Sequence, residues 1–389
     1  MLELKPERGP SGFVSSVWEF PAVPESREDR PRIYRWYGTL PSGLVRRLLG
    51  LYATPESTVA DIFSGVGTTL VEAATMGIPC IGYESNPLGC LVSKARLHPW
   101  RGSTEELRQY SNKVLITTEG EANFAKEALS SGLFGYTAKW FHPQTLDDLL
   151  RTAYRIGQCE NPDFRMQALV ALATTTKNVS NIDARCTHHL VTKKRAPVPV
   201  APLLVKTIDA IATSSSQARV PVVHASKVIQ ANSLVEQLEI RPDPDFVIAH
   251  PPYPGVITYN LVHRPVTDML QAYARVFQEP VDLDFRFERI KEADMSTDDD
   301  DAYFKDIEQL TARIATYLRP GGHCAFIIGD SRHNGFLRHP FTNVITAMEA
   351  HGLMLQENFV WVLNNNGGMH IKRRGHYIDH NYILVFARG

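Results

Sequence analysis

The chain has 389 residues, with 41 basic and 42 acidic side chains and a formal net charge of -1. This balance excludes a generally basic protein that coats nucleic acid, so a nucleic-acid partner would have to be held by local basic clusters. With five scattered cysteines and neither a membrane-length apolar run nor a signal sequence, we expect a cytoplasmic protein with reduced cysteines and no membrane partner.

The first part of the chain predicts an arm followed by alternating helices and strands. Residues 1–33 are rich in Pro, Arg and Glu without clear periodicity, which is typical of an N-terminal arm. The patterns that follow predict a helix over 41–51, a strand over 58–63, a helix over 68–76, a strand over 78–83 and a helix over 87–95. A strand, a glycine loop, a helix and a second strand in this order predict a βαβ unit that begins a parallel sheet.

A block of helical patterns over 104–176 interrupts this alternation, and strand patterns return near 220–231. The rest of the chain predicts a strand ending at Ala249, a helix over 302–318, a strand in "GGHCAFIIGDS", a helix over 342–350 and strands over 354–363 and 377–387. We therefore divide the chain into three parts: the arm over 1–33, a discontinuous α/β domain over 34–100 and 216–389, and a helical insertion over 101–215.

The glycine loop in "DIFSGVGTTLVEAATMGIPCIGYESNP" predicts a nucleotide-binding turn. Gly65 and Gly67 let the backbone turn tightly, and the amides that open the next helix can face a ligand. A P-loop needs a lysine where Thr68 stands, and a nicotinamide fingerprint needs a third glycine where Leu70 stands. S-adenosylmethionine is the remaining candidate, and Glu84 ends the second strand where an acid binds a ribose diol. A plain strand-to-helix turn is the structural alternative.

A second motif, "HPPY" over 250–253, directly follows the strand that ends at Ala249. Prolines fix φ and lack an amide donor, so this stretch can neither continue a sheet nor begin an ordinary helix turn. The motif predicts a rigid loop that presents carbonyls and a ring. In the structural alternative, the two prolines only stiffen a loop and Tyr253 is a core residue.

Together, "DIFSGVGTT", "EAATMGIPCIGYESNP" and the later "HPPY" resemble the S-adenosylmethionine-dependent DNA amino-methyltransferases over about 34–86 and 226–389. The resemblance implies a Rossmann-like fold with a mostly parallel sheet and an antiparallel C-terminal strand. It implies methylation of an exocyclic nitrogen, adenine N6 or cytosine N4, on a base flipped out of double-stranded DNA. It also implies S-adenosylmethionine as cofactor and no metal, and the family suggests a restriction or defence partner. The oligomeric state is left open.

The resemblance assigns roles to individual residues. In the family, the glycine loop, the strand-end acid and a covering segment, here "YRWYGTLP" over 34–41, hold the cofactor. This implicates Tyr34, Thr39, Asp61, Phe63, Gly65, Gly67, Thr68 and Glu84, and Asn232 falls near where the family often has an acidic residue that contacts the adenine of the cofactor. The tetrapeptide binds the target base, so the candidate catalytic residues are His250, Pro251, Pro252 and Tyr253. The Pro251 carbonyl and a neutral His250 imidazole can accept from the amine, and Tyr253 can stack on the base. The motif "LRPGGHCAFIIGDS" resembles a strand that borders the base pocket and has Asp330 and Ser331 at its tip.

His250 departs from the family, which usually has Asp, Asn or Ser at this position. A histidine accepts a hydrogen bond only through an unprotonated ring nitrogen, and its protonation in acid should lower activity. The order of the motifs favours adenine as the target, whereas the non-acidic first position favours cytosine. The sequence leaves the target base open.

The block between the two motifs corresponds to the family's target-recognition region. Basic residues that can contact a DNA backbone lie in the insertion and near the C-terminus: Arg185, Lys193, Lys194, Arg195, Lys372, Arg373 and Arg374. A solvated surface is the alternative for the first of these clusters. Cys186, His188 and His189 do not predict a zinc site, because no second ligand pair follows at suitable spacing.

Other functions stay open at this point. Pro79-Cys80 is similar to the nucleophile motif of cytosine-carbon methyltransferases, but Cys80 lies at the start of the second strand and is expected in the core. An RNA or protein-glutamine methyltransferase would share both motifs. A non-catalytic DNA-binding relative would bind the cofactor without turnover.

Overall fold

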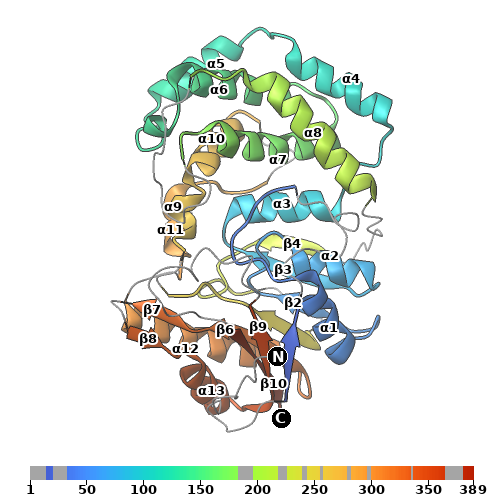
Figure 1. Ribbon diagram of the computed structural model, residues 1–389, viewed down its shortest axis with the longest axis vertical. Coiled ribbons are helices and arrows are strands. Elements are labelled where there is room, and N and C mark those ends of the chain that lie inside the picture. Colours follow the sequence, from blue (N-terminus) through green and yellow to red (C-terminus); the bar gives the residue numbers. More distant parts are fainter. Residues whose placement is uncertain are drawn as a thin grey trace, which may run out of the picture.

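The computed structural model describes residues 15–20, 33–182, 196–217, 226–238, 243–254, 257–277, 282–295, 299–333, 336–363 and 380–389, without the side chains of 214–217, 331–333 and 336–338. The strands lie in the lower half of the molecule in Figure 1. They are β1 (Ser16–Glu19), β2 (Val59–Asp61), β3 (Cys80–Glu84), β4 (Lys227–Gln230), β5 (Phe246–Ala249), β6 (His323–Gly329), β7 (Ser331–His333), β8 (Phe336–Arg338), β9 (Leu353–Val362) and β10 (His380–Arg388).

The main sheet has eight strands in the order β1-β9-β10-β6-β5-β2-β3-β4. Only β10 runs antiparallel to its neighbours, which confirms the predicted Rossmann-like sheet with an antiparallel C-terminal strand. From β2 the chain builds outward to β3 and β4 on one side, and it later places β5 and β6 on the other side. Ligands of open α/β sheets bind at the carboxyl ends of the strands where the order reverses, so the crevice at β2 and β5 is the expected site.

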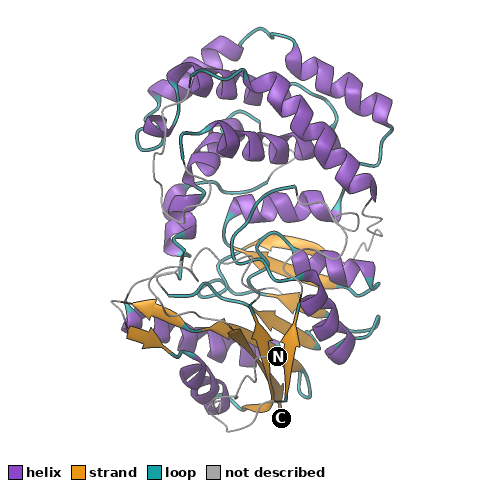
Figure 2. Ribbon diagram, in the orientation of Figure 1, coloured by secondary structure: helices purple, strands orange, loops and turns teal. Residues whose placement is uncertain are grey.

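Helices cover both faces of the sheet (Figure 2). Alternate residues of β5 point to opposite faces, and so Ile248 packs with Leu70 on one face while Val247 packs with Leu310 on the other. The first face is covered by α1 (Ser42–Tyr52), α2 (Thr68–Thr75) and α3 (Pro87–Leu97). The second face is covered by α12 (Asp300–Tyr317) and α13 (Phe341–Ala350).

A helical layer lies beyond α3 (Figure 1). It consists of α4 (Thr104–Leu115), α5 (Glu121–Ser130), η1 (Ala138–Trp140), α6 (Pro143–Gly157), α7 (Pro162–Val179) and α8 (Val200–Gln217). After the loop over 250–253, the chain adds α9 (Tyr259–Val262), α10 (Arg264–Ala274) and α11 (Phe287–Glu292). Met269 of α10 lies in the same core as Leu169 of α7 and Leu91 of α3. In the described ranges, no helix is both long and apolar enough to cross a bilayer.

Two strand features were not anticipated from the sequence. The predicted arm contributes β1, which runs parallel to β9 and places Trp18 opposite Trp361. Trp18 also stacks on Phe359, with ring centroids 4.3 Å apart. Beyond β6, β7 and β8 form an antiparallel hairpin. Each of these strands has only three or four residues, too few for an alternating pattern to be recognised. The strand predicted over 220–225 lies outside the described residues.

Candidate active site

The two sequence motifs meet at the reversal point of the sheet. Strands β2 and β5 are parallel neighbours, with Asp61 opposite Ile248. The amide of Ile62 donates to the Ile248 carbonyl at 3.1 Å, just where both strands end. The glycine loop over 63–67 and the loop over 250–253 therefore leave the same edge of the sheet side by side. Strand pairing alone brings together motifs that are far apart in the sequence.

Glu84, the last residue of β3, holds the glycine loop. Its Oε2 accepts from the Gly65 amide at 2.8 Å, and its Oε1 accepts from the Asn86 amide at 2.7 Å. Burial raises the pKa of Glu84 to about 7, although both amide hydrogen bonds lower it. The carboxyl group is thus partly protonated near neutral pH. A hydroxyl donor placed against it would favour the ionised form.

One face of α3 supports the glycine loop from the other side. Ser93 Oγ donates to the Gly65 carbonyl at 3.0 Å, and Arg96 Nη1 donates to the Val66 carbonyl at 2.6 Å. A Cβ on Gly89 would lie 2.8 Å from the Gly65 carbonyl oxygen, so only glycine allows this approach. The sequence analysis missed all three helix residues. Their signal is a small residue at 89 and another at 93, one turn apart on the same face.

The two glycines of the loop have different surroundings. Gly65 and Gly67 both have left-handed backbones, with φ of 53° and 74°. A Cβ on Gly65 would point to the covering segment, 3.3 Å from Trp36 Nε1. A Cβ on Gly67 would lie 2.7 Å from Ser93 Oγ, inside the contact with α3. A larger side chain at Gly67 would therefore disturb the packing against α3, whereas one at Gly65 would enter the space below Trp36.

Further predicted cofactor residues surround the loop. Asp61 is buried, and its Oδ1 accepts from the Phe63 amide at 3.0 Å. Burial raises the pKa of Asp61 to about 6. Thr68 opens α2, where its Oγ1 accepts from Arg96 Nη1 at 3.4 Å. These contacts fix the shape of the loop from within.

The covering segment lies over the glycine loop through stacked aromatic rings. The Trp36 ring stacks on His263 with centroids 4.2 Å apart and an interplanar angle of 6°. The Tyr34 hydroxyl lies 3.1 Å from His263 Nδ1 and is buried, whereas Thr39 is exposed and donates to the Trp36 carbonyl at 3.4 Å. His263 directly precedes α10, so the segment after the Pro-Pro-Tyr loop fixes the cover of the glycine loop.

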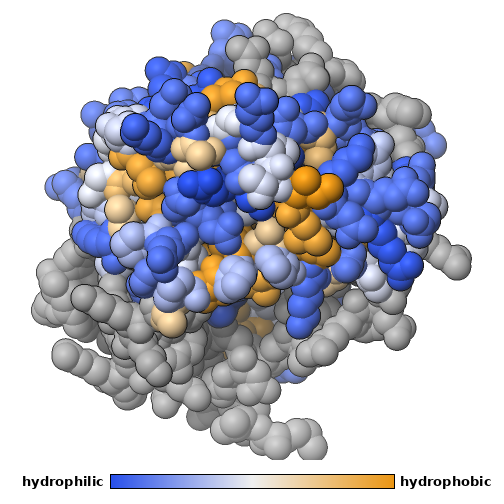
Figure 3. Space-filling model, turned by 90° about the horizontal axis from the view of Figure 1, so that it is seen from above, coloured by the Kyte–Doolittle hydropathy of each residue, from blue (hydrophilic) through white to orange (hydrophobic). Residues whose placement is uncertain are grey.

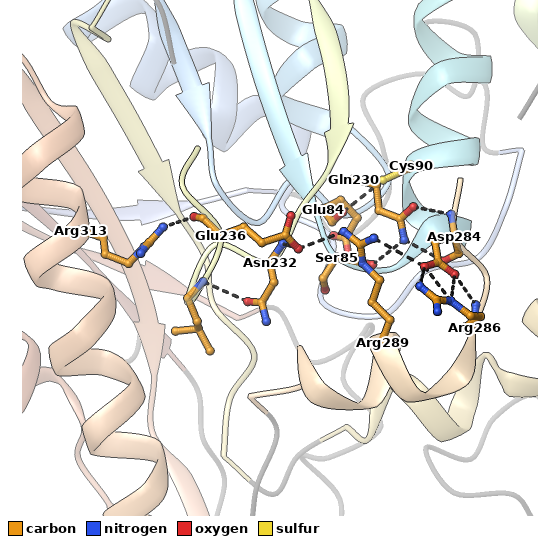
Figure 4. A network of polar contacts seen from close by, with 11 residues as sticks. Glu84, Ser85, Cys90, Gln230, Asn232, Glu236, Asp284, Arg286, Arg289 and Arg313 are labelled. Carbon is orange, nitrogen blue, oxygen red and sulfur yellow. Dashed lines mark hydrogen bonds and ion pairs between the residues drawn. The ribbon is translucent and has the colours of Figure 1, made fainter. Parts of the chain in front are cut away.

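A polar network lines the crevice beyond Glu84 (Figure 4). Asn232 follows β4 beside Glu84, because the residue before it donates its amide to the Glu84 carbonyl at 3.1 Å. The Asn232 Oδ1 accepts from the backbone amide two residues further on at 3.0 Å. The guanidinium of Arg289, on α11, pairs with two carboxylates: its Nη2 lies 3.0 Å from Glu236 Oε1, and its Nη1 lies 3.6 Å from Asp284 Oδ2. This network ties α11 to the end of β4.

The loop over 250–253 is closed by a contact between its first and last residues. His250 Nε2 lies 3.0 Å from the Tyr253 hydroxyl, and the two rings meet edge to face. Burial lowers the pKa of His250 to about 4 and raises the pKa of Tyr253 well above its usual value. Both rings are therefore neutral at physiological pH. The Nε2 atom is engaged by the tyrosine, which the sequence analysis did not anticipate.

Two residues outside the motif hold the loop in place. Tyr303 of α12 is fully buried, and its hydroxyl donates to the Pro252 carbonyl at 3.2 Å. A Cβ on Gly329, the last residue of β6, would lie 2.9 Å from the Tyr253 ring. Neither residue was identified from the sequence. Since the Pro252 carbonyl is occupied, the Pro251 carbonyl is the better candidate for an acceptor that faces a substrate.

The residues predicted to contact the substrate are described only in part. Asp330 is buried at the end of β6, and its Oδ1 lies 3.1 Å from His339 Nδ1. Ser331 begins β7, and its side chain lies outside the described residues. The predicted DNA-contacting residues lie outside them altogether: Arg185, Lys193, Lys194, Arg195, Lys372, Arg373 and Arg374.

Comparison with known proteins found one matching family model and several solved structures of similar fold. Residues 5–94 match a family model of the N6 and N4 methyltransferases that is described as DNA methylase. The match covers the covering segment, the glycine loop and Glu84. It confirms the predicted resemblance, and S-adenosylmethionine is the cofactor of this family. No curated protein matches the chain.

Among solved structures, TrmN from Thermus thermophilus is 11% identical to this chain, with a TM-score of 0.36. The match covers 91% of this chain and 50% of TrmN, so the chain spans about half the length of TrmN. A TehB-like methyltransferase from Corynebacterium glutamicum ATCC 13032 is 10% identical, with a TM-score of 0.33 and coverage of 89% and 87%. An S-adenosylmethionine-dependent methyltransferase from Methanosarcina mazei is 9% identical, with a TM-score of 0.34 and coverage of 88% and 97%. By its sheet topology the chain has a Rossmann-like fold, and over residues 5–94 it is similar to the DNA methylase family.

Proposed function

We propose that the protein methylates an exocyclic amino nitrogen, adenine N6 or cytosine N4, of a base flipped out of double-stranded DNA. One observation carries the proposal: the parallel pairing of β2 with β5 sets the glycine loop and the Pro-Pro-Tyr loop at one edge of the sheet. The family match over residues 5–94 supports DNA as the substrate class. The insertion over 101–215 stays the candidate recognition region.

The residues around the glycine loop fit S-adenosylmethionine. Glu84 can accept from both hydroxyls of a ribose, and its place at the end of β3 is where this contact occurs in nucleotide-binding sheets. Gly65 keeps the crevice open below Trp36. When bound, the cofactor would supply a methyl group already activated on a sulfonium, so the protein has to orient the amine, and the amine proton is then released to water.

The Pro-Pro-Tyr loop provides the groups for this task. The lone pair of an exocyclic amine is delocalised into the base, and an acceptor aimed at its N–H bond makes that lone pair more available. The Pro251 carbonyl is the proposed acceptor, because Tyr303 already occupies the carbonyl of Pro252. Tyr253 is the proposed stacking partner for the flipped base. A loop fixed by two prolines loses little entropy when the base binds.

His250 is proposed to act through Tyr253. Its Nε2 lies 3.0 Å from the Tyr253 hydroxyl, and its neutral ring can hold that hydroxyl at physiological pH. A direct contact of Nε2 with the target amine would require this hydrogen bond to break. Histidine at the first position of the motif is thus compatible with either target base.

A methyl-transfer assay with tritiated S-adenosylmethionine tests the proposal. Purified protein is offered genomic DNA, total RNA and cell protein in separate reactions, and labelled nucleosides are separated afterwards. We expect label on DNA as N6-methyladenine or N4-methylcytosine. Label only on RNA or on protein glutamine, or on the carbon of cytosine, would contradict the proposal. Cofactor binding without label on any substrate would support the non-catalytic relative.

A further inference from the structure

Two lysines and two arginines are held against aromatic rings where the insertion meets the covering segment. Lys177, near the end of α7, lies between two tyrosines: its Nζ is 5.3 Å from the Tyr34 ring centroid and 4.9 Å from that of Tyr37. Arg35 lies over the Tyr37 ring as well, with Cζ at 5.7 Å. Burial and the nearby charge of Arg35 lower the pKa of Lys177 to about 8. An anion bound here would favour the charged form of the lysine.

A second pair of cations flanks another tyrosine. Lys139 Nζ lies 4.3 Å from the Tyr136 ring centroid and 5.0 Å from that of Trp140. Arg264 Cζ lies 4.3 Å from the Tyr136 ring and 3.8 Å from the ring of Phe287. Contacts of this kind attract a cation to the ring face and hold its long side chain in one place.

The two pairs lie on elements that contact one another, and we call the four residues Arg35, Lys139, Lys177 and Arg264 the cation band. The amide of Asn181, one turn beyond Lys177, donates to the Trp140 carbonyl at 2.7 Å. On the other side, Tyr34 contacts His263, the residue directly before Arg264. The band thus crosses from the covering segment over α7 to the start of α10, and these two helices pack in one core (Figure 1).

Three of the four cations of the band have no acidic partner among the described residues. Arg35, Lys139 and Lys177 form no ion pair with a carboxylate there, whereas Arg264 forms a long one with Asp268 at 3.7 Å. Two arginines elsewhere are closely paired: Arg155 lies 2.6 Å from Glu121, and Arg319 lies 2.7 Å from Asp245. The chain has 42 acidic and 41 basic residues, so a shortage of acids does not explain the difference.

One end of the band follows the Pro-Pro-Tyr loop closely in the chain. The chain leads from Tyr253 through α9 directly to Arg264, so the band adjoins the loop proposed to bind the flipped base. Lys139 and Arg35 are exposed and open the band to solvent. The face of the molecule seen in Figure 3 is mainly hydrophilic, with separate apolar groups. Leu115 and Ile116 of the insertion are exposed.

We propose that the cation band binds the DNA phosphates that flank the flipped base. The inference rests on the proposed function and names a contact surface for its substrate. Phosphate contacts need no knowledge of the recognition sequence, because cations bind the backbone of any duplex. The aromatic rings hold the cations ready, so they lose little side-chain freedom on binding.

Fluorescence anisotropy of a labelled DNA duplex, titrated at a series of KCl concentrations with saturating sinefungin, tests the band. Lys139→Ala and Lys177→Ala should each weaken binding about tenfold near 0.1 M salt and lower the slope of log K against log salt by about one. Arg35→Ala is a third band variant, at an exposed position. Lys113→Ala is the matched control, because this exposed lysine lies 5.2 Å from the Tyr110 ring on α4, outside the band.

The outcomes separate the band from the proposed function. If all three band variants bind the DNA duplex with the affinity and salt slope of the parent, the proposed role of the band is wrong, even if the parent methylates DNA. A loss of sinefungin affinity with unchanged DNA binding would assign the cations to the carboxylate of the cofactor and overturn it too. Weakening confined to an RNA duplex of the same sequence would make the partner RNA. A parent that binds DNA through the band but never methylates it would overturn the proposed function alone.

Discussion

The glycine loop and the Pro-Pro-Tyr loop leave neighbouring strands, but they are supported differently. The glycine loop is held by the backbone and side chains of two other elements: Glu84 of β3, and Ser93 and Arg96 of α3. The Pro-Pro-Tyr loop is held by its own prolines, by the internal contact of His250 with Tyr253, and by Tyr303. Substitutions in the first loop should therefore affect cofactor affinity, and those in the second should affect turnover.

The largest expected effect comes from Gly65→Val. A branched side chain at φ 53° is strained, and its Cβ would lie 3.3 Å from Trp36 Nε1 in the crevice. Cofactor affinity measured by calorimetry should fall by more than about 100-fold. Gly77→Val is the matched control, because Gly77 has φ 74° but no atom near its Cβ, so it should lower stability and leave affinity intact. Equal affinity losses in both variants would contradict a specific role of Gly65.

The next largest effect is expected at Glu84, because burial raises the pKa of its carboxyl group to about 7. Ribose hydroxyls favour the ionised carboxylate, so binding should release a proton, and affinity should rise as pH increases through about 7. Glu84→Gln should weaken binding about 10- to 100-fold and abolish this dependence, because a charged acceptor is lost. Calorimetry in buffers of different ionisation enthalpy measures the released proton. A variant that keeps the parental pH dependence would place the titrating group elsewhere.

On the other loop, His250→Ala and Tyr253→Phe should each lower kcat about tenfold with little change in cofactor affinity. If His250 acts through the tyrosine hydroxyl, the double variant should be no slower than the slower single variant. Because burial lowers the pKa of His250 to about 4, its ring stays neutral from roughly pH 5 to 8. The acid limb expected from the sequence should thus be shifted close to pH 4. Additive losses in the double variant would favour a direct contact with the amine.

The smallest effect is expected for Tyr303→Phe, which removes the hydroxyl that donates to the Pro252 carbonyl. The loop should become less fixed, and kcat should fall about fivefold at unchanged cofactor affinity. Tyr317→Phe, on the same helix but away from the loop, is the control. A fall in cofactor affinity rather than in kcat would show that the two loops are not separable in this way.

Local patterns were enough to locate both loops from the sequence. Strands β2 and β5 are short apolar runs. The first leads into the glycine loop at Gly65, and the second is ended by Pro251-Pro252, which cannot continue a sheet. The family match then confirmed the resemblance that the two motifs suggested. Glu84 was found in the same way, as the acid that ends a strand.

The supports of the loops could not be read from the sequence, because they depend on contacts between distant residues. Tyr303 is 51 positions from Pro252, and His263 is 229 positions from Tyr34. The segment over 257–295 carried no predicted element. Even so, α10 opens with Pro265 at its first turn and repeats apolar residues at helical spacing, which is a readable signal.

The central claim is that the glycine loop and the Pro-Pro-Tyr loop form one site. A crystal structure of the protein with sinefungin tests it most directly, because the ligand shows where the nucleoside lies and where the transferable group points. We predict the ribose against Glu84, with the amine that replaces the methyl group directed at Pro251 and Tyr253. A nucleoside bound outside the crevice between β2 and β5, or one whose amine points away from the 250–253 loop, would contradict the claim.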